Sequence, residues 1–354
     1  MRMKRTATTA ARTGIVLAAA IALLAGCSST AEPADDETDA PDYGPLSLQL
    51  SFVKNTQNAG EYMADSEGFY TEAGFESVTL VAGPTAVEAS VATEKSNVGF
   101  STALGTATAI TQEDMPLKII GSVYAQNAFT IMSMEGENAI EQPADLAGKR
   151  IGVTAGTARS LVEAFATAND VDPAEITFVP AEGNTALLTS GEVDGYFGLE
   201  TNELLVLQLA GEKVVSLPLA TNGLPLAGTS FVVTQDAIEN DRELVKAFLV
   251  AEIRGWAAAI ADPDAGAELA ISTYGKDLGL NPAKEKAQAK AQVANVLTPE
   301  AEKSGLFLLT KEQMTANIEA LELVGIDIAA KDLFDMTLLQ EVYDENPDLL
   351  TITR

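Results

Sequence analysis

The 354-residue chain contains no histidine, one cysteine and few cations. Without histidine it can form no Ser-His-Asp or Cys-His catalytic group and no His-ligated zinc or haem. A single cysteine excludes an intrachain disulfide, a CxxC redox pair and a cysteine-ligated metal site. The 22 Lys and Arg against 51 Asp and Glu give a formal charge of −29, which argues against nucleic acid as a partner. No metal and no cofactor is therefore expected.

What the chain does contain is enough apolar material for a sizeable core. Its length is typical of two domains or one large one, and 47% of its residues are hydrophobic.

The first 26 residues have the features of a secretory signal peptide. Basic residues precede an apolar stretch at 15–25, which is too short to cross the core of a bilayer. The sequence Leu24-Ala25-Gly26-Cys27 resembles the bacterial lipobox, and this resemblance implies cleavage after Gly26 and a thioether lipid on Cys27. Residues 28–45 are mostly small, polar and acidic, so 27–45 is interpreted as a lipidated cysteine followed by a disordered acidic tether.

Strand and helix patterns alternate through the body of the chain. Leu46, Leu48, Leu50 and Phe52 alternate with polar or small residues, which is the periodicity of a strand. Beyond residue 236 the pattern is almost wholly helical. Alternation of this kind favours an α/β fold with parallel-rich sheets, flanking helices and a helical C-terminal tail. Further strands are predicted at 78–81, 98–100, 117–123, 151–153, 176–179, 195–197, 214–217 and 230–233, and helices at 58–67, 83–94, from 101, 157–167, 184–188 and 202–209.

Three strand-to-helix turns have the polarity of ligand-binding turns. They are Gly83-Pro84-Thr85, Ser101-Thr102-Ala103 and Gly156-Thr157-Ala158. Open α/β sheets bind ligands at the carboxyl ends of their parallel strands, so the three turns together indicate a site. None has the spaced glycines of a dinucleotide fingerprint or the Gly-Lys-Ser/Thr of a phosphate loop.

Polar and aromatic residues supply further candidates. Glu200 and Glu203 flank Asn202 at the start of a helix, but no nucleophile or metal cluster accompanies them, so general acid/base catalysis is not indicated. They suit an amino group or a protonated ring nitrogen better. Candidates for stacking on a flat ligand are Tyr62, Tyr70, Tyr124 and Tyr196.

Several segments resemble the substrate-binding proteins of ABC importers, in the branch shared by thiamine-pyrimidine synthase-like and sulfonate- and nitrate-binding proteins. Residues 52–64 read FVKNTQNAGEYMA and residues 68–75 read GFYTEAGF. Residues 145–153 read DLAGKRIGV, and residues 191–203 read GEVDGYFGLETNE. The resemblance covers about residues 46–260.

The resemblance implies a periplasmic-binding-protein fold of the type II clamshell class. Domain 1 would comprise 46–128 plus 233–354, domain 2 would comprise 129–232, and a ligand would lie in the cleft between them. It implies a non-enzymatic lipoprotein, expected to be a monomer, on the extracytoplasmic face of the cell membrane, which delivers a small molecule to an ABC permease and its ATPase. The iron motif of the synthase is absent, so synthase chemistry is not expected.

The nature of the ligand follows partly from the resemblance and partly from charge. The pyrimidine-binding branch carries a histidine where this chain has Asn58, and the amide still suits a thiamine-pyrimidine or riboflavin-type heterocycle. In the candidate segments the only cations are Lys54 and Arg159, too few to favour an anion. We therefore expect an uncharged or cationic nitrogen heterocycle, stacked on tyrosine and hydrogen-bonded by Asn55, Asn58 and Glu203.

Three other interpretations stay open. A small anion such as an alkanesulfonate, taurine or nitrate is the alternative ligand. An α/β hydrolase or transferase would need a nucleophile elbow, a base or a metal cluster, and none is present in the sequence. A surface sensor that passes a ligand signal to a membrane partner is the third. The full set of predicted ligand-binding residues is Asn55, Gln57, Asn58, Tyr62, Gly83, Pro84, Thr102, Ala103, Tyr124, Gln126, Gly156, Thr157, Ala158, Tyr196, Glu200, Asn202 and Glu203.

The lipid anchor can be tested separately. Replacing Cys27 by serine removes the thiol that would carry the lipid, so Cys27→Ser is expected to release the protein into the medium. Immunoblotting of membrane and medium fractions measures this, and retention of the variant at the membrane would refute lipidation.

Overall fold

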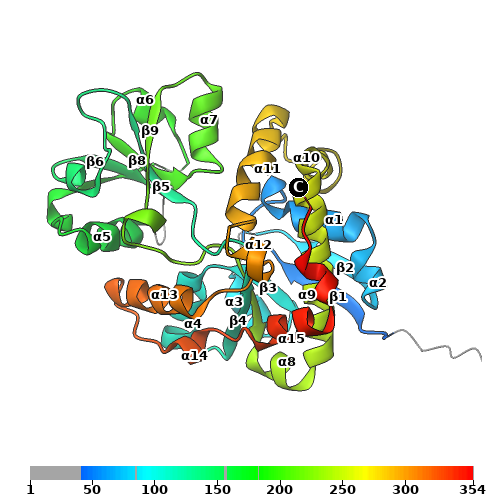
Figure 1. Ribbon diagram of the computed structural model, residues 1–354. Coiled ribbons are helices and arrows are strands. Elements are labelled where there is room, and N and C mark those ends of the chain that lie inside the picture. The colour runs from blue at the N-terminus through cyan, green and yellow to red at the C-terminus, as the bar shows by residue number, and fades with distance from the viewer. Residues whose placement is uncertain (1–40, 84–85, 155–157, 182, 354) are drawn as a thin grey trace, which may run out of the picture. The chain divides into compact units, whose positions relative to one another are not determined.

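The computed structural model describes residues 41–83, 86–154, 158–181 and 183–353, and the strands of these residues form two five-stranded sheets (Figure 1). The predicted signal peptide and Cys27 lie outside the described residues.

The first sheet has the strand order β2-β1-β3-β10-β4. β1 runs parallel to β2 and β3, whereas β10 is antiparallel to both of its neighbours. Leu46, Leu48 and Leu50 are buried as the alternation predicts. The strands are β1 (Gly44–Gln49), β2 (Phe75–Val81), β3 (Val98–Ser101), β4 (Leu117–Ser122) and β10 (Ser230–Thr234).

The second sheet repeats this arrangement in the order β7-β6-β8-β5-β9. β6 is parallel to β7 and β8, and β5 is antiparallel to β8 and β9. In each sheet the antiparallel strand is the first one after the chain arrives from the other sheet. The strands are β5 (Phe129–Met134), β6 (Arg150–Val153), β7 (Thr177–Pro180), β8 (Gly195–Leu199) and β9 (Val214–Pro218).

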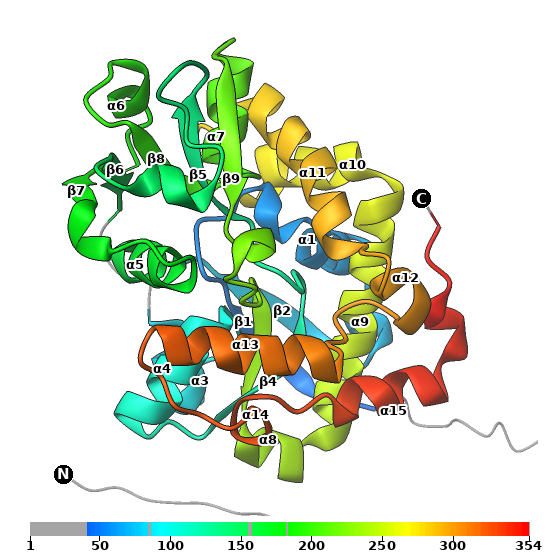
Figure 2. The same ribbon diagram turned by 60° about the vertical axis from the view of Figure 1, so that its left-hand side comes forward.

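Helices connect the strands and form the C-terminal part of the chain (Figures 1 and 2). The helices before β10 are η1 (Thr56–Asn58), α1 (Ala59–Ser66), α2 (Phe69–Glu72), α3 (Val87–Ala92), α4 (Ala103–Glu113), η2 (Pro143–Leu146), α5 (Ala158–Ala168), η3 (Pro173–Glu175), α6 (Ala186–Thr189), α7 (Glu203–Leu209) and η4 (Ala220–Asn222). Those after it are α8 (Gln235–Asn240), α9 (Arg242–Ala261), α10 (Pro263–Leu269), η5 (Ala270–Tyr274), α11 (Pro282–Val296), α12 (Ala301–Ser304), α13 (Lys311–Leu323), α14 (Ala330–Leu333), α15 (Thr337–Glu345) and η6 (Pro347–Leu350).

The α/β class with parallel-rich sheets and a helical C-terminal part is confirmed, with differences in detail. β5 was not predicted as a strand, because Thr130 and Ser133 interrupt its apolar pattern although both are buried. β1 begins at Gly44, inside the segment interpreted as tether. The domain boundary predicted at 232/233 falls within β10, which belongs to the first sheet from Ser230 onward.

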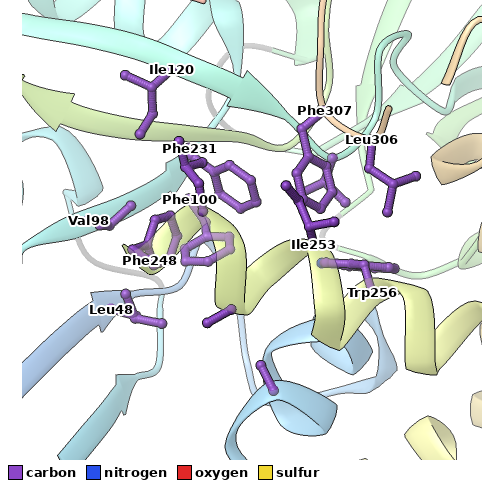
Figure 3. Close-up of a cluster of buried hydrophobic side chains, with 14 of the residues drawn as sticks. Leu48, Val98, Phe100, Ile120, Phe231, Phe248, Ile253, Trp256, Leu306 and Phe307 are labelled. Atoms are coloured by element: carbon purple, nitrogen blue, oxygen red, sulfur yellow. The ribbon is translucent and has the colours of Figure 1, made fainter. Parts of the chain in front are cut away.

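The core of the first sheet is built around the ring of Phe231 on β10. Figure 3 shows this ring among side chains from β3, α9 and the segment before α13. Its edge-to-face partners are Phe100, Phe248 and Phe307, at centroid distances of 5.3, 5.3 and 4.9 Å. The α9 helix thereby covers the sheet, and its Trp256 is buried.

A close approach between two helices depends on glycine. α1 packs on α9 where a Cβ at Gly60 would lie 2.2 Å from the Trp256 ring. The absence of a side chain at Gly60 thus lets the two helices come together. Within the described ranges, no helix combines the length and the hydropathy needed to cross a bilayer.

Two carboxyl groups are buried at this helix contact. Glu61 on α1 accepts a hydrogen bond from Trp256 Nε1 at 3.3 Å, and Glu252 on α9 accepts one from the Tyr70 hydroxyl. The Oε2 atom of each glutamate has no partner among the described residues. Burial raises the pKa of Glu61 to about 7, and burial together with the nearby Glu61 charge raises the pKa of Glu252 well above its usual range.

The Glu61 carboxyl should make stability depend on pH. Its pKa is higher in the folded protein than the 4.5 of an unperturbed glutamate, so the folded state binds the proton more tightly. Its contribution to stability is complete below about pH 4.5 and is lost as the pH rises through about 7. Glu61→Gln should therefore flatten the fall in unfolding free energy between pH 5 and pH 8 by about 1–3 kcal/mol.

Denaturant unfolding at several pH values measures this effect. Glu67→Gln, at the exposed C-terminal end of the same helix, is the matched control and should keep the wild-type pH dependence. An unchanged pH dependence for Glu61→Gln would contradict the account.

Candidate functional site

The described residues include a pocket of about 530 Å³ at the carboxyl ends of parallel strands from both sheets. Pockets of this size hold small ligands with most of their surface buried. Its lining residues are Ser51, Phe52, Asn55, Gln57, Thr102, Tyr124, Asn127, Ala128, Phe129, Thr154, Gly183, Phe197, Gly198, Leu199, Thr201, Asn202, Glu203, Gly228, Thr229 and Gln288.

The chain crosses between the sheets twice beside this pocket, at 123–128 and at 219–229. The two crossings are hydrogen-bonded to each other: Val123 N–H donates to the Thr229 carbonyl at 2.7 Å, and Gly228 N–H donates to the Tyr124 carbonyl at 2.9 Å. They form a paired ribbon that supports one end of the pocket.

Asn127 ties the two crossings together. Its Nδ2 donates to the carbonyls of Leu224 and Leu226, both at 3.0 Å, and its Oδ1 accepts from Phe129 N–H at 3.0 Å. All of these groups lie at the point where the chain enters β5. The buried Asn127 amide therefore has a structural role, and both hydrogens of its Nδ2 are used by backbone carbonyls.

The end of β1 supplies the first wall. Phe52 follows this strand and is 46% exposed. A Cβ at Gly83 would lie 2.7 Å from the Ser51 carbonyl, and Gly83 N–H donates to the Phe52 carbonyl at 2.9 Å. Gly83 thus acts behind the pocket, where its lack of a side chain lets the ends of β1 and β2 meet and position Phe52.

The start of α7 supplies polar groups on the opposite wall. Glu203 Oε2 accepts from Leu199 N–H at 2.8 Å, and Glu203 Oε1 accepts from Asn202 Nδ2 at 2.8 Å. A Cβ at Gly198 would lie 2.9 Å from Glu203 Oε2, so glycine there admits the carboxylate. The Glu203 carboxylate is therefore held in place by the protein itself as well as lining the pocket.

Aromatic rings make up much of the remaining surface. Phe129 and Phe197, from β5 and β8, stack with centroids 5.1 Å apart. The Tyr124 hydroxyl donates to Gln292 Oε1 at 3.2 Å, so its polar end is used inside the protein. The pocket therefore offers flat apolar faces with polar groups at its edges, which suits a planar ring.

The structure brings together a minority of the predicted ligand-binding residues. Those that line the pocket are Asn55, Gln57, Thr102, Tyr124, Asn202 and Glu203. Those that lie elsewhere are Asn58, Tyr62, Gly83, Ala103, Gln126, Ala158, Tyr196 and Glu200. The predictions for Pro84, Gly156 and Thr157 fall outside the described residues.

Burial explains why three of the predicted stacking residues do not line the pocket. Tyr62 is fully buried and stacks on Tyr274 at a centroid distance of 4.2 Å. Tyr196 is packed among apolar side chains, and burial raises its pKa to about 12. Tyr70 is buried against Glu252. Besides Tyr124, the aromatic residues in the described lining are the phenylalanines Phe52, Phe129 and Phe197.

The other predicted residues that do not line the pocket also have local contacts that explain their positions. Asn58 is buried, and its Nδ2 lies 3.4 Å from both the Val53 carbonyl and the Tyr62 hydroxyl. Glu200 Oε1 accepts from Ser216 Oγ at 3.0 Å. Ala103 and Ala158 are buried core residues, and Gln126 is exposed beside the crossing whose inward residue is Asn127.

Neither of the two expected cations reaches the pocket. Arg159 pairs with Glu163 at 2.8 Å and lies over the ring of Phe178. Lys54 is not a lining residue, and among the described lining residues Glu203 alone carries a charge. In the same ranges, no group of three or more Asp, Glu or Cys is placed to hold a metal ion.

Sequence reasoning missed several lining residues. Phe52 and Thr154 each follow a parallel strand, so the rule that ligands bind at carboxyl ends could have identified them. Gln288 lies on α11, far along the chain in the helical part, and no motif marks it. In both views α11 lies beside α7 (Figures 1 and 2), which brings Gln288 to the pocket.

Two sequence comparisons place the chain among known proteins. The profile of the family described as "NMT1/THI5 like" matches residues 55–266. The riboflavin-binding protein RibY of Chloroflexus aurantiacus is 29% identical over 270 residues, which are 71% of this chain and 75% of RibY.

Solved structures share the fold at low sequence identity. The periplasmic nitrate-binding protein NrtA of Synechocystis PCC 6803 has a TM-score of 0.63 at 11% identity, covering 88% of this chain and 92% of NrtA. The periplasmic aliphatic sulphonate-binding protein SsuA of Escherichia coli has a TM-score of 0.59 at 15% identity, covering 82% and 92%. The desulfurization enzyme DSZB shares the fold too, with a TM-score of 0.55 at 15% identity over 85% and 99%.

The hydrogen bonds by which Asn127 links the two crossings can be tested by measuring stability. Asn127→Ala removes three hydrogen bonds and leaves Phe129 N–H without its partner, so the unfolding free energy should fall by about 2–4 kcal/mol. Urea denaturation measures the change. Asn138→Ala, at an exposed position, should alter it by no more than about 0.5 kcal/mol. Equal effects of the two substitutions would show that Asn127 does not hold the crossings.

Proposed function

This chain belongs to the NMT1/THI5-like family, and from that premise we propose that it is the solute-binding protein of an ABC importer. It captures a flat nitrogen heterocycle of the riboflavin type and releases it chemically unchanged. The observation that carries the proposal is the pocket of about 530 Å³ whose described lining is rich in aromatic rings and contains no Lys or Arg.

The chemistry of this lining fits an uncharged aromatic ligand. Phe52 presents an exposed face from the first wall, while the half-buried Phe129, stacked on the buried ring of Phe197, lines the second. Ring stacking of this kind stabilises planar heterocycles, and the amides of Asn55, Gln57, Asn202 and Gln288 can hydrogen-bond their edges.

Among heterocycles, a riboflavin-type ring is favoured over a thiamine pyrimidine. RibY, the relative matched over most of both chains, is named for riboflavin binding. The pocket is also large for a single six-membered ring, whereas a tricyclic ring extends across both walls.

A small anion is the alternative ligand. The observation in its favour is that NrtA and SsuA, which share the fold, are described as nitrate-binding and aliphatic sulphonate-binding proteins. An oxyanion that leaves water needs cationic or multiple N–H donors. The Glu203 carboxylate in the pocket would repel it, so the observed charge favours the heterocycle.

The proposed mechanism is capture between two walls. The ribbon at 123–128 and 219–229 is the connection about which the walls can move, and a ligand that touches both favours the state in which they are closer. Release to a permease and its ATPase, attachment through Cys27 and action as a monomer belong to the same proposal. A sensor would use the same capture step, and an enzyme would alter the ligand.

Binding can be measured by riboflavin fluorescence. Stacking on aromatic rings should quench the flavin, with saturation at one ligand per protein. Taurine and nitrate should show no binding in calorimetry and should not displace bound riboflavin. Riboflavin recovered after the protein is denatured should have an unchanged mass in mass spectrometry.

Phe52→Ala should weaken riboflavin binding about tenfold by removing one stacking face, without lowering the melting temperature.

Leu323→Ala is the matched control, because Leu323 is similarly exposed and lies outside the pocket lining. It should leave the affinity unchanged. Binding of taurine or nitrate in place of riboflavin and the thiamine pyrimidine, or turnover of the ligand, would contradict the proposal.

A further inference from the structure

Helix α11 buries a polar stripe where a surface helix would normally expose one. Lys284, Glu285, Gln288 and Gln292 have the spacing of one helix face, and all four are buried. Glu285 Oε2 accepts from Thr56 N–H at 2.9 Å, and Gln292 Nε2 donates to the Thr56 carbonyl at 3.0 Å. The stripe therefore anchors η1, and with it Asn55 and Gln57, beside the pocket.

Lys284 fixes the orientation of the Gln288 amide. The Lys284 ammonium donates to Gln288 Oε1 at 2.6 Å and to Glu285 Oε1 at 3.2 Å. An ammonium has no acceptor, so the oxygen of the amide must face Lys284. Gln288 Nε2 has no partner among the described residues, and Gln288 lines the pocket. The group that Gln288 offers to a ligand is therefore an N–H donor.

Two neighbouring groups are fixed in the same sense. Asn55 Oδ1 accepts from Gln57 N–H at 3.0 Å, which leaves its Nδ2 as a donor. Thr102 Oγ1 accepts from Gly105 N–H at 3.1 Å, which leaves the hydroxyl hydrogen to donate. Because a backbone N–H only donates, neither orientation can reverse without losing its bond. This wall, which we call the donor wall, consists of Asn55, Thr102 and Gln288.

The opposite wall has the reverse polarity. Asn202 Nδ2 donates one of its two hydrogens to Glu203 Oε1 at 2.8 Å, which fixes the amide and leaves Oδ1 as an acceptor. The Glu203 carboxylate beside it also only accepts. The donor wall therefore presents donors and the wall at the start of α7 presents acceptors. Gln57, which is outside the donor wall as defined, donates from Nε2 to Thr229 Oγ1 at 3.4 Å and keeps an acceptor oxygen.

We propose that this polarity determines which ligand is bound and which way round it lies. The ligand presents an edge of carbonyl oxygens and unprotonated ring nitrogens to the donor wall, and a ring N–H or amino group to Asn202 and Glu203. Gln288 is a specificity-determining residue, and Lys284 is the positioning residue that fixes it as a donor. This inference rests on the proposed function, since it describes how the same pocket recognises and orients its heterocycle.

The direct test reverses the polarity of one group. In Gln288→Glu the carboxylate stays paired with Lys284 and turns an acceptor oxygen toward the ligand edge. Riboflavin should bind at least about 100-fold more weakly, because the lost donor is replaced by an acceptor that faces acceptors. Gln340→Glu makes the same exchange at an exposed position outside the pocket and should bind as the wild type does.

The role of Lys284 is tested by a double-mutant cycle. Gln288→Met and Lys284→Met should each weaken riboflavin binding about tenfold. If Lys284 acts through Gln288, adding Lys284→Met to Gln288→Met should cost little more. A general structural role for Lys284 would instead make the two losses multiply. Melting temperatures of all variants identify any that fail to fold.

The outcomes of these experiments distinguish a failure of this inference from a failure of the proposed function. Wild-type protein that binds riboflavin, with unchanged affinity in Gln288→Glu, would overturn this inference and leave the proposed function standing. Multiplying losses in the cycle would remove Lys284 from it. Wild-type protein that binds neither riboflavin nor the thiamine pyrimidine would overturn the proposed function and this inference together.

Discussion

The pocket depends on the requirement that buried polar groups find hydrogen-bond partners. Helix α11 carries Lys284, Glu285, Gln288 and Gln292 into the protein, and each can remain there only because a matching group meets it. Meeting these demands ties α11 to η1 and to Tyr124. The residues that face the ligand are thus held by bonds that point away from it. When the oxygen of a fixed side-chain amide is bonded inside the protein, only its NH2 group can reach a ligand, and the reverse also holds. The internal hydrogen bonds therefore decide whether the side chain acts as a donor or as an acceptor.

The same logic distinguishes the two ends of the site. At the crossings, Asn127 donates both hydrogens of its Nδ2 to backbone carbonyls and accepts a backbone N–H, so it serves mainly the connection. At the start of α7, Glu203 is partly used by Leu199 N–H and Asn202, and still lines the pocket. Recognition therefore rests on groups that are half satisfied. Glu203 is the one charged residue in the described lining, so under the proposed function the site would discriminate by hydrogen-bond polarity and by ring stacking, and not by attraction of an anion.

The sequence predicts the fold well because local patterns and tertiary structure agree along most of the chain. The alternation of Leu46, Leu48 and Leu50 reports a strand whose one face is buried. It misses β5, where Thr130 and Ser133 are buried and their hydroxyls bond to Ser216 Oγ and Ile140 N–H, because polar residues in a core leave no periodic signal. The site is predicted where a turn after a strand marks it, as at Thr102. It is not predicted at Gln288, because a polar stripe on a helix reads as a solvated face until the helix is seen packed against η1 and α7.

The central claim is that a planar heterocycle lies between the two walls with its acceptor edge toward the donor wall. A crystal structure of the protein with riboflavin tests this most directly. We expect the flavin ring against Phe52, with a carbonyl oxygen or ring nitrogen within hydrogen-bond distance of Gln288 Nε2. A ring bound with its acceptor edge toward Asn202, or an oxyanion held in the pocket in its place, would contradict the account.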